Sequence, residues 1–289
     1  MTSAQLPGGV EHAVMLDAAA LLDVDSDGAR LVSSSSRMMW HLPRAGIALA
    51  ISRAGTKSAS DVAAEARAVV AACKAGVRTP PLVAGPLVLA EARHVLAFQW
   101  VDGRPASPGD WTATAAEAAK LATADAESFR PLRWPADWPR KQWSAIVGQQ
   151  LFDILADHSR RAVSLYQEMM QGELVPAHCD LQPANFLIDS HRCAWVIDFE
   201  YASLAPPGWD PAKIVILSRR FGDPPSSDYL LDCWSPSALA RIRDIALVQE
   251  VLLVSWLADM ALNGTAGAHC EVRARSASLG KDARWRHLR

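Results

Sequence analysis

The sequence predicts an α+β protein in which a small sheet with one main helix precedes a larger, mostly helical part. Three observations predict this class: short apolar runs broken by Ser, Pro and Gly in the first hundred residues, helical spacing after Trp111, and a polar hairpin near residue 190. The chain has 289 residues, half of them hydrophobic. That is enough for one large domain or two unequal lobes with their own cores.

The first part opens with a helix-like stretch and continues as strands. Residues 29–55 alternate apolar runs with turn residues, which predicts two or three short strands. In residues 58–81 apolar positions recur at helical spacing, with Ser60 as a candidate N-cap and Gly76 as a stop signal. We therefore expect one main helix here.

Two further strands are predicted before the pattern changes. They cover residues 81–90 and 94–103, and the second ends at the pair Asp102 and Gly103. After Trp111 helical spacing dominates. It predicts helices over residues 114–128 and 143–171, joined by a connector rich in Pro and Trp.

The later part of the chain combines a hairpin with more helices. "FLID" at 186–189 and "AWVID" at 194–198 read as two short strands with polar residues at their ends. Helices are expected to about residue 265. The basic tail, residues 271–289, is expected to be solvated and loosely ordered.

Composition narrows the class of partner. A net charge of −2 and a pI near 6.4 give no electrostatic reason to expect nucleic acid or an anionic membrane. The five cysteines have neither CxxC spacing nor an even count, so neither a disulfide framework nor a zinc site is predicted. The N-terminus lacks the pattern of a secretion signal. We expect a cytoplasmic protein that acts on a small molecule.

One segment concentrates polar side chains among apolar ones. "PAHCDLQPANFLID", residues 176–189, contains Asp180 and Asn185, and the strand that follows ends at Asp198. Phosphoryl transfer needs an acid near the acceptor hydroxyl and oxygen ligands for magnesium. A loop and a hairpin end can bring these three side chains together. A single Asp or Asn there would more simply form a turn, but the three together favour a catalytic site.

These residues also resemble a known family. The order "HCDLQPAN" and then "VIDFE" is similar to the H-G-D-x-x-x-x-N loop and following I-D strand of the aminoglycoside phosphotransferase and choline kinase-like enzymes. The resemblance implies a two-lobed protein-kinase-like fold. It implies a nucleotide-binding lobe over residues 1–103 and a catalytic and substrate-binding lobe over residues 104–289, with ATP and Mg²⁺ as cofactors.

The resemblance assigns roles to the residues of this loop. Asp180 would orient the substrate hydroxyl and accept its proton, and Asn185 and Asp198 would be the magnesium ligands. His178 would maintain the shape of the loop. Asp210, in "GWDPAKI", would brace it.

Further upstream the resemblance covers the nucleotide site. The glutamate of the main helix corresponds to Glu65, which in this family pairs with a strand cation. The segment "LAFQWVDG" looks like the hinge between the lobes. There the backbone carbonyl of Gln99 and the backbone amide of Val101 would bind adenine.

The main departure from the family pattern is the absent strand cation. Family members place Lys or Arg on the third strand, where a gap-free alignment gives Ala50. Arg53, Arg37 or Lys57 would have to substitute, or phosphate binding would be weaker.

Two smaller departures concern the loops. Cys179 stands where the family usually has Gly, which we expect to be harmless. The segment before the second strand has no glycine, so Ser33 to Ser36 would have to bind phosphates through amides and hydroxyls.

Three functions stay open at this stage. A kinase that modifies an antibiotic and a metabolic kinase for an amino alcohol or sugar share the chemistry, and a catalytically silent nucleotide-binding protein is the alternative from another class. The sequence does not distinguish ATP from GTP or fix the oligomeric state. Four tryptophans are candidates for a substrate cleft, although most of the eleven are expected in the core: Trp111, Trp134, Trp138 and Trp143.

Overall fold

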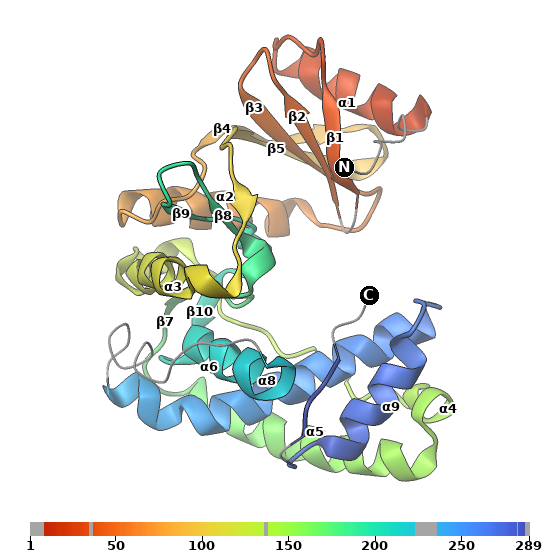
Figure 1. Cartoon of the computed structure of the whole chain (residues 1–289). Helices are drawn as coiled ribbons and strands as arrows, with labels where there is room; N and C mark the ends of the chain where they lie inside the picture. Colours follow the sequence, from red (N-terminus) through yellow and green to blue (C-terminus); the bar gives the residue numbers. More distant parts are fainter. Residues whose placement is uncertain (1–8, 35–36, 136–137, 223–235, 282, 287–289) are drawn as a thin grey trace.

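The chain folds into a sheet-containing part and a helical part, one above the other in Figure 1. The computed structural model describes residues 9–34, 37–135, 138–222, 236–281 and 283–286. The change from sheet to helix follows β5, which ends at Gln99. The domain boundary at Gly103 stays a prediction.

The sheet has five antiparallel strands in the order β1-β2-β3-β5-β4. Their bounds are Arg30–Ser34 (β1), Arg37–Leu42 (β2), Ile47–Ser52 (β3), Leu82–Leu89 (β4) and Arg93–Gln99 (β5). Helix α1, Gly9–Leu21, and helix α2, Ala59–Lys74, cover opposite faces of this sheet (Figure 1). Helix α1 corresponds to the helix-like stretch expected at the start of the chain, and α2 is the predicted main helix.

Side chains of β2 alternate between the two faces of the sheet, and this alternation determines which of them face α2. Met38 and Trp40 are buried in the cluster that contains α1. Met39 packs on the other face with Val62 of α2. Because successive side chains of a strand point to opposite faces, Arg37 shares the α2 face with Met39.

Helix α2 begins and ends at clear local signals. The N-cap is Ser58, not Ser60 as expected, and it forms a capping box with Asp61. The helix ends at Lys74, and Gly76 follows with φ = +78°, which confirms it as the stop signal. This fixed start places Glu65 on the buried face of the helix, where it is 4% exposed.

The second part is mostly helical. Its helices are α3 (Trp111–Lys120), α4 (Trp143–Val147), α5 (Gln149–Met169), α6 (Trp209–Ile216), α8 (Pro236–Leu262) and α9 (Ala268–Ser278). Its short strands are β6 (Arg104–Pro105), β7 (Val175–Ala177), β8 (Phe186–Ile188), β9 (Ala194–Val196) and β10 (Ser203–Ala205). Strands β8 and β9 form the predicted hairpin, with Leu187 opposite Trp195.

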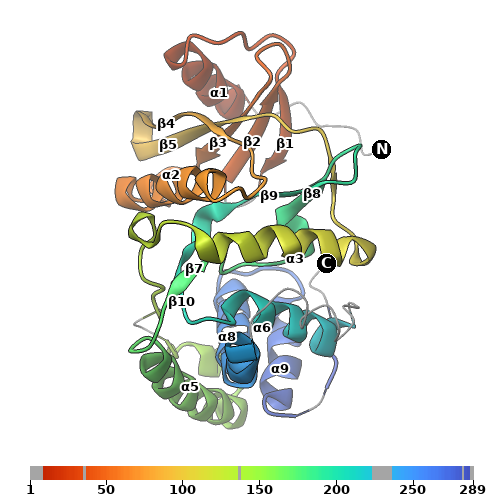
Figure 2. The same ribbon diagram turned by 90° about the vertical axis from the view of Figure 1, so that its left-hand side faces the viewer.

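Helix α8 is the central helix of this part and contacts α5, α6 and α9. Figure 2 shows it end-on between them. Residues Arg241–Leu262 are long and apolar enough to cross a membrane by length and composition alone, but most of this stretch is buried. Such burial is typical of the core helix of a globular domain.

Two helices differ from the sequence-based prediction. The helix expected over 114–128 spans only Trp111–Lys120 and gives way to short 3₁₀ turns. The helix expected over 143–171 is broken into α4 and α5 at Gly148, which has φ = +84°. Residues other than glycine avoid this backbone conformation. The break was not predicted because apolar residues recur at helical spacing on both sides of Gly148.

The loosely ordered tail was a wrong prediction for its described residues. Residues Ala268–Ser278 form α9, and Trp285 is buried, 6% exposed. The buried Arg220 donates to the carbonyls of Lys281 and Ala283 and lies over the ring of Trp285. The guanidinium of Arg220, stacked on the indole and bonded to two carbonyls, anchors the segment around Trp285. A prediction from net charge does not take such contacts into account.

Candidate active site

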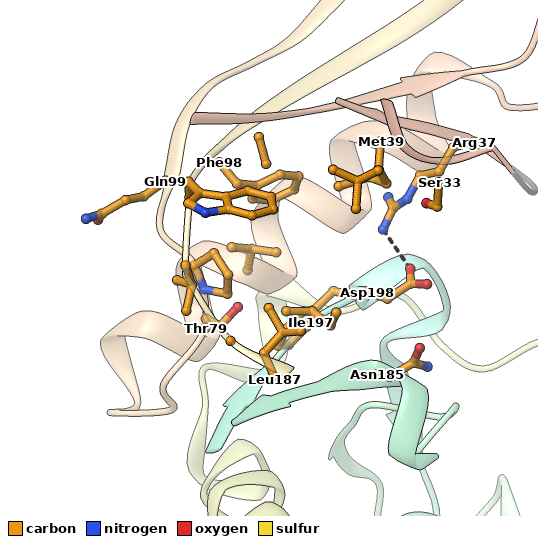
Figure 3. A pocket seen from close by; sticks show the side chains of 18 of the residues that line it. Ser33, Arg37, Met39, Thr79, Phe98, Gln99, Asn185, Leu187, Ile197 and Asp198 are labelled. Atoms are coloured by element: carbon orange, nitrogen blue, oxygen red, sulfur yellow. Dashed lines mark hydrogen bonds and ion pairs between the residues drawn. The ribbon is translucent and has the colours of Figure 1, made fainter. Parts of the chain in front are cut away.

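A cavity of about 380 Å³ lies between the α2 face of the sheet and the β8–β9 hairpin (Figure 3). Five of the six predicted site residues line it: Glu65, Gln99, Val101, Asn185 and Asp198. The sixth, Asp180, is bonded directly to Asn185. The fold therefore brings together residues that the sequence spreads over nearly half of its length.

One end of the cavity is apolar. Phe98, Leu187 and Ile197 are among its lining residues, and Figure 3 shows them stacked from the strand above to the hairpin below. A flat aromatic group bound there would exchange water for apolar contact on both faces.

The polypeptide beside this apolar end offers backbone groups to a ligand. The amide of Gln99 donates to the carbonyl of Pro81 at 2.9 Å. Proline has no N–H, so it cannot return the bond to the carbonyl of Gln99. The side chain of Gln99 points away from the cavity in Figure 3. Its backbone is thus the part that a ligand would meet, as the sequence-based hypothesis requires.

The opposite end of the cavity is charged, and Arg37 is its centre. Arg37 Nη1 lies 2.5 Å from Glu65 Oε1, and Arg37 Nη2 lies 2.8 Å from Asp198 Oδ1. The Arg37 side chain is 11% exposed. Although burial opposes it, the two carboxylates raise the pKa of Arg37 above its ordinary value. The guanidinium is therefore a permanent cation in this cavity.

Lys57 is a second cation on the same glutamate. Its Nζ lies 3.3 Å from Glu65 Oε2 and 3.1 Å from Glu200 Oε2. Burial alone would raise the pKa of Glu65, but the charges of Arg37 and Lys57 outweigh it and lower that pKa. Glu65 is therefore an ionised carboxylate at neutral pH.

The contacts of the three candidate substitutes for the strand cation distinguish them from one another. Arg37 and Lys57 meet at Glu65, while Arg53 Nη2 donates to the hydroxyl of Ser34 at 2.9 Å in an exposed setting. Ala50 is 4% exposed and packs against α2 without a charged group. Ser35 and Ser36, expected to help bind phosphates, lie outside the described residues.

The loop at Asp180 has a dense hydrogen-bond pattern. Asp180 Oδ2 accepts from Gln182 Nε2 at 2.8 Å and from Asn185 Nδ2 at 2.9 Å. The same Asn185 nitrogen donates to the carbonyl of Asp180 at 2.8 Å. These bonds fix the carboxylate and orient the remaining oxygen of Asn185 away from Asp180.

Helix α6 braces this loop from below. Asp210 accepts the amide of His178 at 2.8 Å and the amide of Cys179 at 2.9 Å. His178 Nε2 contacts the carbonyl of Ile197 at 2.9 Å, which ties the loop to the end of β9. Burial raises the pKa of Asp210, and the charge of His178 and the two amides oppose that rise.

The backbone conformation at Cys179 shows why the family usually has glycine at this position of the loop. It has φ = +65°, the left-handed region in which a side chain is strained. Asp198 has the same kind of backbone, with φ = +67° and ψ = +67°. Both positions therefore carry local strain, which is common at active sites.

Asn185 and Asp198 fit a magnesium ion that is shared with a bound nucleotide. They supply two hard oxygens to one cavity, and the Asp198 side chain is 36% exposed. Mg²⁺ prefers such ligands and usually keeps waters or phosphate oxygens at its other positions. Among the described residues no group of three or more His, Cys, Asp or Glu side chains could hold a metal by itself. The Arg37–Asp198 pair would have to rearrange when a metal binds.

Of the four tryptophans proposed for a substrate cleft, three pack in the helical core, and the side chain of the fourth, Trp111, lies outside what the structure describes. Trp143 is fully buried, so it does not line a cleft. Trp138 and Trp143 both donate to Asp259 of α8, at 3.1 and 2.8 Å. Trp134 packs against the same core. These rings have a structural role in the core.

The sequence did not lead us to one charged group of the site, Lys213, which contacts Asp180.

Comparison with known proteins agrees with this geometry. A sequence model of the phosphotransferase enzyme family matches residues 35–243. No curated protein matches the chain significantly. The solved structure of the microcompartment-associated aminopropanol kinase superposes with a TM-score of 0.67 at 21% identity, covering 92% of this chain and 98% of that one.

Two other solved structures are equally similar in fold. Choline kinase LicA from Streptococcus pneumoniae has a TM-score of 0.64 at 15% identity and covers 94% of this chain and 100% of that one. The GDP complex of aminoglycoside 2'-phosphotransferase-IIIa has a TM-score of 0.67 at 13% identity and covers 93% and 98%. The two-lobed protein-kinase-like fold expected from the sequence is confirmed.

Proposed function

Because the chain belongs to the phosphotransferase enzyme family, we propose that it transfers the γ-phosphoryl group of ATP to a hydroxyl group of a small molecule. The observation that supports this most is the continuous chain of contacts from Glu65 through Arg37 to Asp198 in one cavity, beside the Asn185–Asp180 pair. Cations for phosphates, oxygens for a metal and an acid for the acceptor are thus adjacent.

The nucleotide occupies the cavity from end to end in this proposal. Adenine lies in the apolar end and bonds to the carbonyl of Gln99 and the amide of Val101. The α- and β-phosphates contact Arg37, which Glu65 orients. Lys57 adds a second positive charge beside Glu65. The nucleotide-binding lobe is residues 1–103 and the catalytic lobe is residues 104–289.

Asn185 and Asp198 would hold Mg²⁺, which neutralises charge on the phosphates when it is bound. Asp180 accepts the proton of the acceptor hydroxyl through a carboxylate that Gln182 and Asn185 hold in place. The acceptor oxygen forms a bond to the γ-phosphorus, and the bond from that phosphorus to the bridging oxygen breaks. The electron pair stays on the β-phosphate, so ADP leaves.

The alternative of a catalytically silent nucleotide-binding protein is less well supported. It rested on the absent lysine of the third strand, and Arg37 and Lys57 supply positive charge at Glu65 instead. An acceptor class is not favoured by any single contact. Relatives with a similar fold are a choline kinase, an aminopropanol kinase and an aminoglycoside phosphotransferase, so amino alcohols and antibiotics are both candidates. We place the reaction in the cytoplasm, where ATP is available.

The test is phosphoryl transfer with magnesium and either ATP or GTP, over a panel of aminoglycosides, macrolides, amino alcohols and sugars. We expect one class to stimulate nucleotide turnover, and Asp180→Asn to lower that turnover by about 100-fold or more, since the acid–base contribution is typically of that size. Asp153→Asn, an exposed carboxylate on α5, is the matched control. Turnover that Asp180→Asn leaves intact would contradict the proposal.

A further inference from the structure

Helix α6 presents two charged residues, one turn apart, to the catalytic loop. Asp210 accepts the amides of His178 and Cys179. Lys213 follows at i+3, on the same face of the helix. Its Nζ lies 3.3 Å from Asp180 Oδ1. One turn of helix therefore fixes both the backbone of the loop and the carboxylate that the loop carries.

The two oxygens of Asp180 have different partners. Oδ2 accepts from the side-chain amides of Gln182 and Asn185. Oδ1 has Lys213 as its partner among the described residues. An acceptor hydroxyl that gives its proton to Asp180 therefore meets the oxygen that Lys213 also contacts, because the other oxygen is already used by two amides.

The setting of Lys213 is unusual for a lysine. Its side chain is 13% exposed, and Asp180 is the carboxylate with which it forms an ion pair in the part of the chain that the structure describes. An ammonium carries three N–H donors, and the contact with Oδ1 uses one of them. A mostly buried ammonium with donors to spare can bind a second anionic group.

Phosphoryl transfer brings such an anion to this place. The acceptor oxygen must lie about 3 Å from both the γ-phosphorus and a carboxylate oxygen of Asp180. Nζ of Lys213 lies 3.3 Å from Oδ1, so it stands beside the acceptor oxygen, on the acceptor side of the γ-phosphoryl group. Without a nearby cation, the carboxylate of Asp180 would repel the phosphoryl group it serves.

We propose that Lys213 is a catalytic cation of this enzyme, which contacts the γ-phosphoryl group from the acceptor side while it holds Asp180. This inference rests on the proposed function. Arg37 serves the α- and β-phosphates from the sheet, and Lys213 serves the γ-phosphoryl group from α6. The alternative is a purely structural ion pair, which would support the loop without sensing the third phosphate.

The two roles predict different ratios between the affinity for an ATP analogue and the affinity for ADP. The test measures, by calorimetry, the affinities of the native protein, Lys213→Met and Lys213→Arg for MgADP and for the magnesium complex of the non-hydrolysable β,γ-imido analogue of ATP. Lys74→Met, an exposed lysine in the last turn of α2, is the control. Thermal unfolding of each variant reports whether the fold is retained.

We expect Lys213→Met to weaken binding of the ATP analogue by about tenfold or more while MgADP affinity changes less than about twofold, as for loss of one charge-assisted contact. Lys213→Arg should restore most of the difference, and the control should match the native protein. An unchanged ratio, or an equal loss for both nucleotides, would overturn the inference. A native protein that binds neither nucleotide would instead contradict the proposed function and remove the basis of the inference.

Discussion

Glu65 illustrates how burial and charge compete at one residue. Its side chain is 3% exposed, yet the neighbouring Arg37 and Lys57 lower its pKa below the ordinary value of 4.5. A carboxyl group with a lowered pKa in the folded state stabilises the fold above its unfolded pKa, and this stabilisation is lost as the pH falls through the folded pKa.

We therefore expect a pH-dependent difference between the native protein and Glu65→Gln. The native protein should be more stable at neutral pH, and the difference in free energy of unfolding should shrink below about pH 4.5 as the carboxylate takes up a proton. Urea unfolding from pH 7 down to about pH 4 measures it. A difference that stays constant or grows toward acid pH would contradict the assigned direction of the pKa.

Cys179 allows a second test at the residue scale. Its φ of +65° costs about 1–2 kcal/mol for a residue with a Cβ atom. Cys179→Gly removes this cost but also loses the packing of the thiol, so its stability should stay within about 1 kcal/mol of the native protein. Cys179→Val adds a branched side chain at a positive φ and should be clearly less stable. Equal melting temperatures for both variants would show that the strain is unimportant.

Among the elements, α6 links the catalytic loop to the helical core. Its contacts run to α8 on one side, and Asp210 holds two loop amides on the other. In Asp210→Asn the amide group would face one of those N–H donors and leave it unpaired. This should cost about 1–3 kcal/mol of stability and lower turnover more than nucleotide affinity. Equal losses of turnover and affinity would mean that Asp210 supports the whole site and not the loop alone.

The elements also show what the sequence could predict. The β8–β9 hairpin, the main helix α2 and the brace at Asp210 follow from local spacing and from the family pattern, because each is specified within a short segment. The substitution by Arg37 could not be predicted uniquely. It depends on β2 pairing beside β3, with Met39 opposite Ala50, so that a neighbouring strand reaches the place of the absent cation.

The other differences between prediction and structure have separate causes. Residues 283–286 are anchored because Arg220 and Trp285 meet through tertiary packing, which charge and composition do not reveal. Lys213 lies three positions after Asp210, and that spacing on a predicted helix was the signal that could have identified it. Gly148 ended a helix inside a continuous periodic pattern.

At the scale of the whole molecule, four ion pairs among the described residues join the sheet part to the helical part. They are Arg37–Asp198, Lys57–Glu200, Arg78–Glu117 and Arg130–Asp61. Two of them begin at the cations beside Glu65, so the proposed phosphate site and the contact between the two parts share the same side chains. A nucleotide bound as proposed would compete for Arg37, and its binding would then be coupled to how the two parts meet.

If Arg37 of β2 takes the place of the cation that β3 lacks, the affinity for nucleotide must depend on Arg37. Calorimetric titration of MgATP compares the native protein with Arg37→Met, with Arg53→Met and with the double variant Arg37→Met, Ala50→Lys. Arg37→Met should weaken binding by about 10- to 100-fold, the size of a charge-assisted hydrogen bond, and the lysine at position 50 should recover most of it.

Arg53→Met should change the affinity less than about threefold, because the Arg53 guanidinium donates to Ser34 in an exposed setting, whereas Arg37 and Lys57 are the cations that contact Glu65. Native-like MgATP affinity in Arg37→Met, or a larger loss in Arg53→Met, would contradict this assignment.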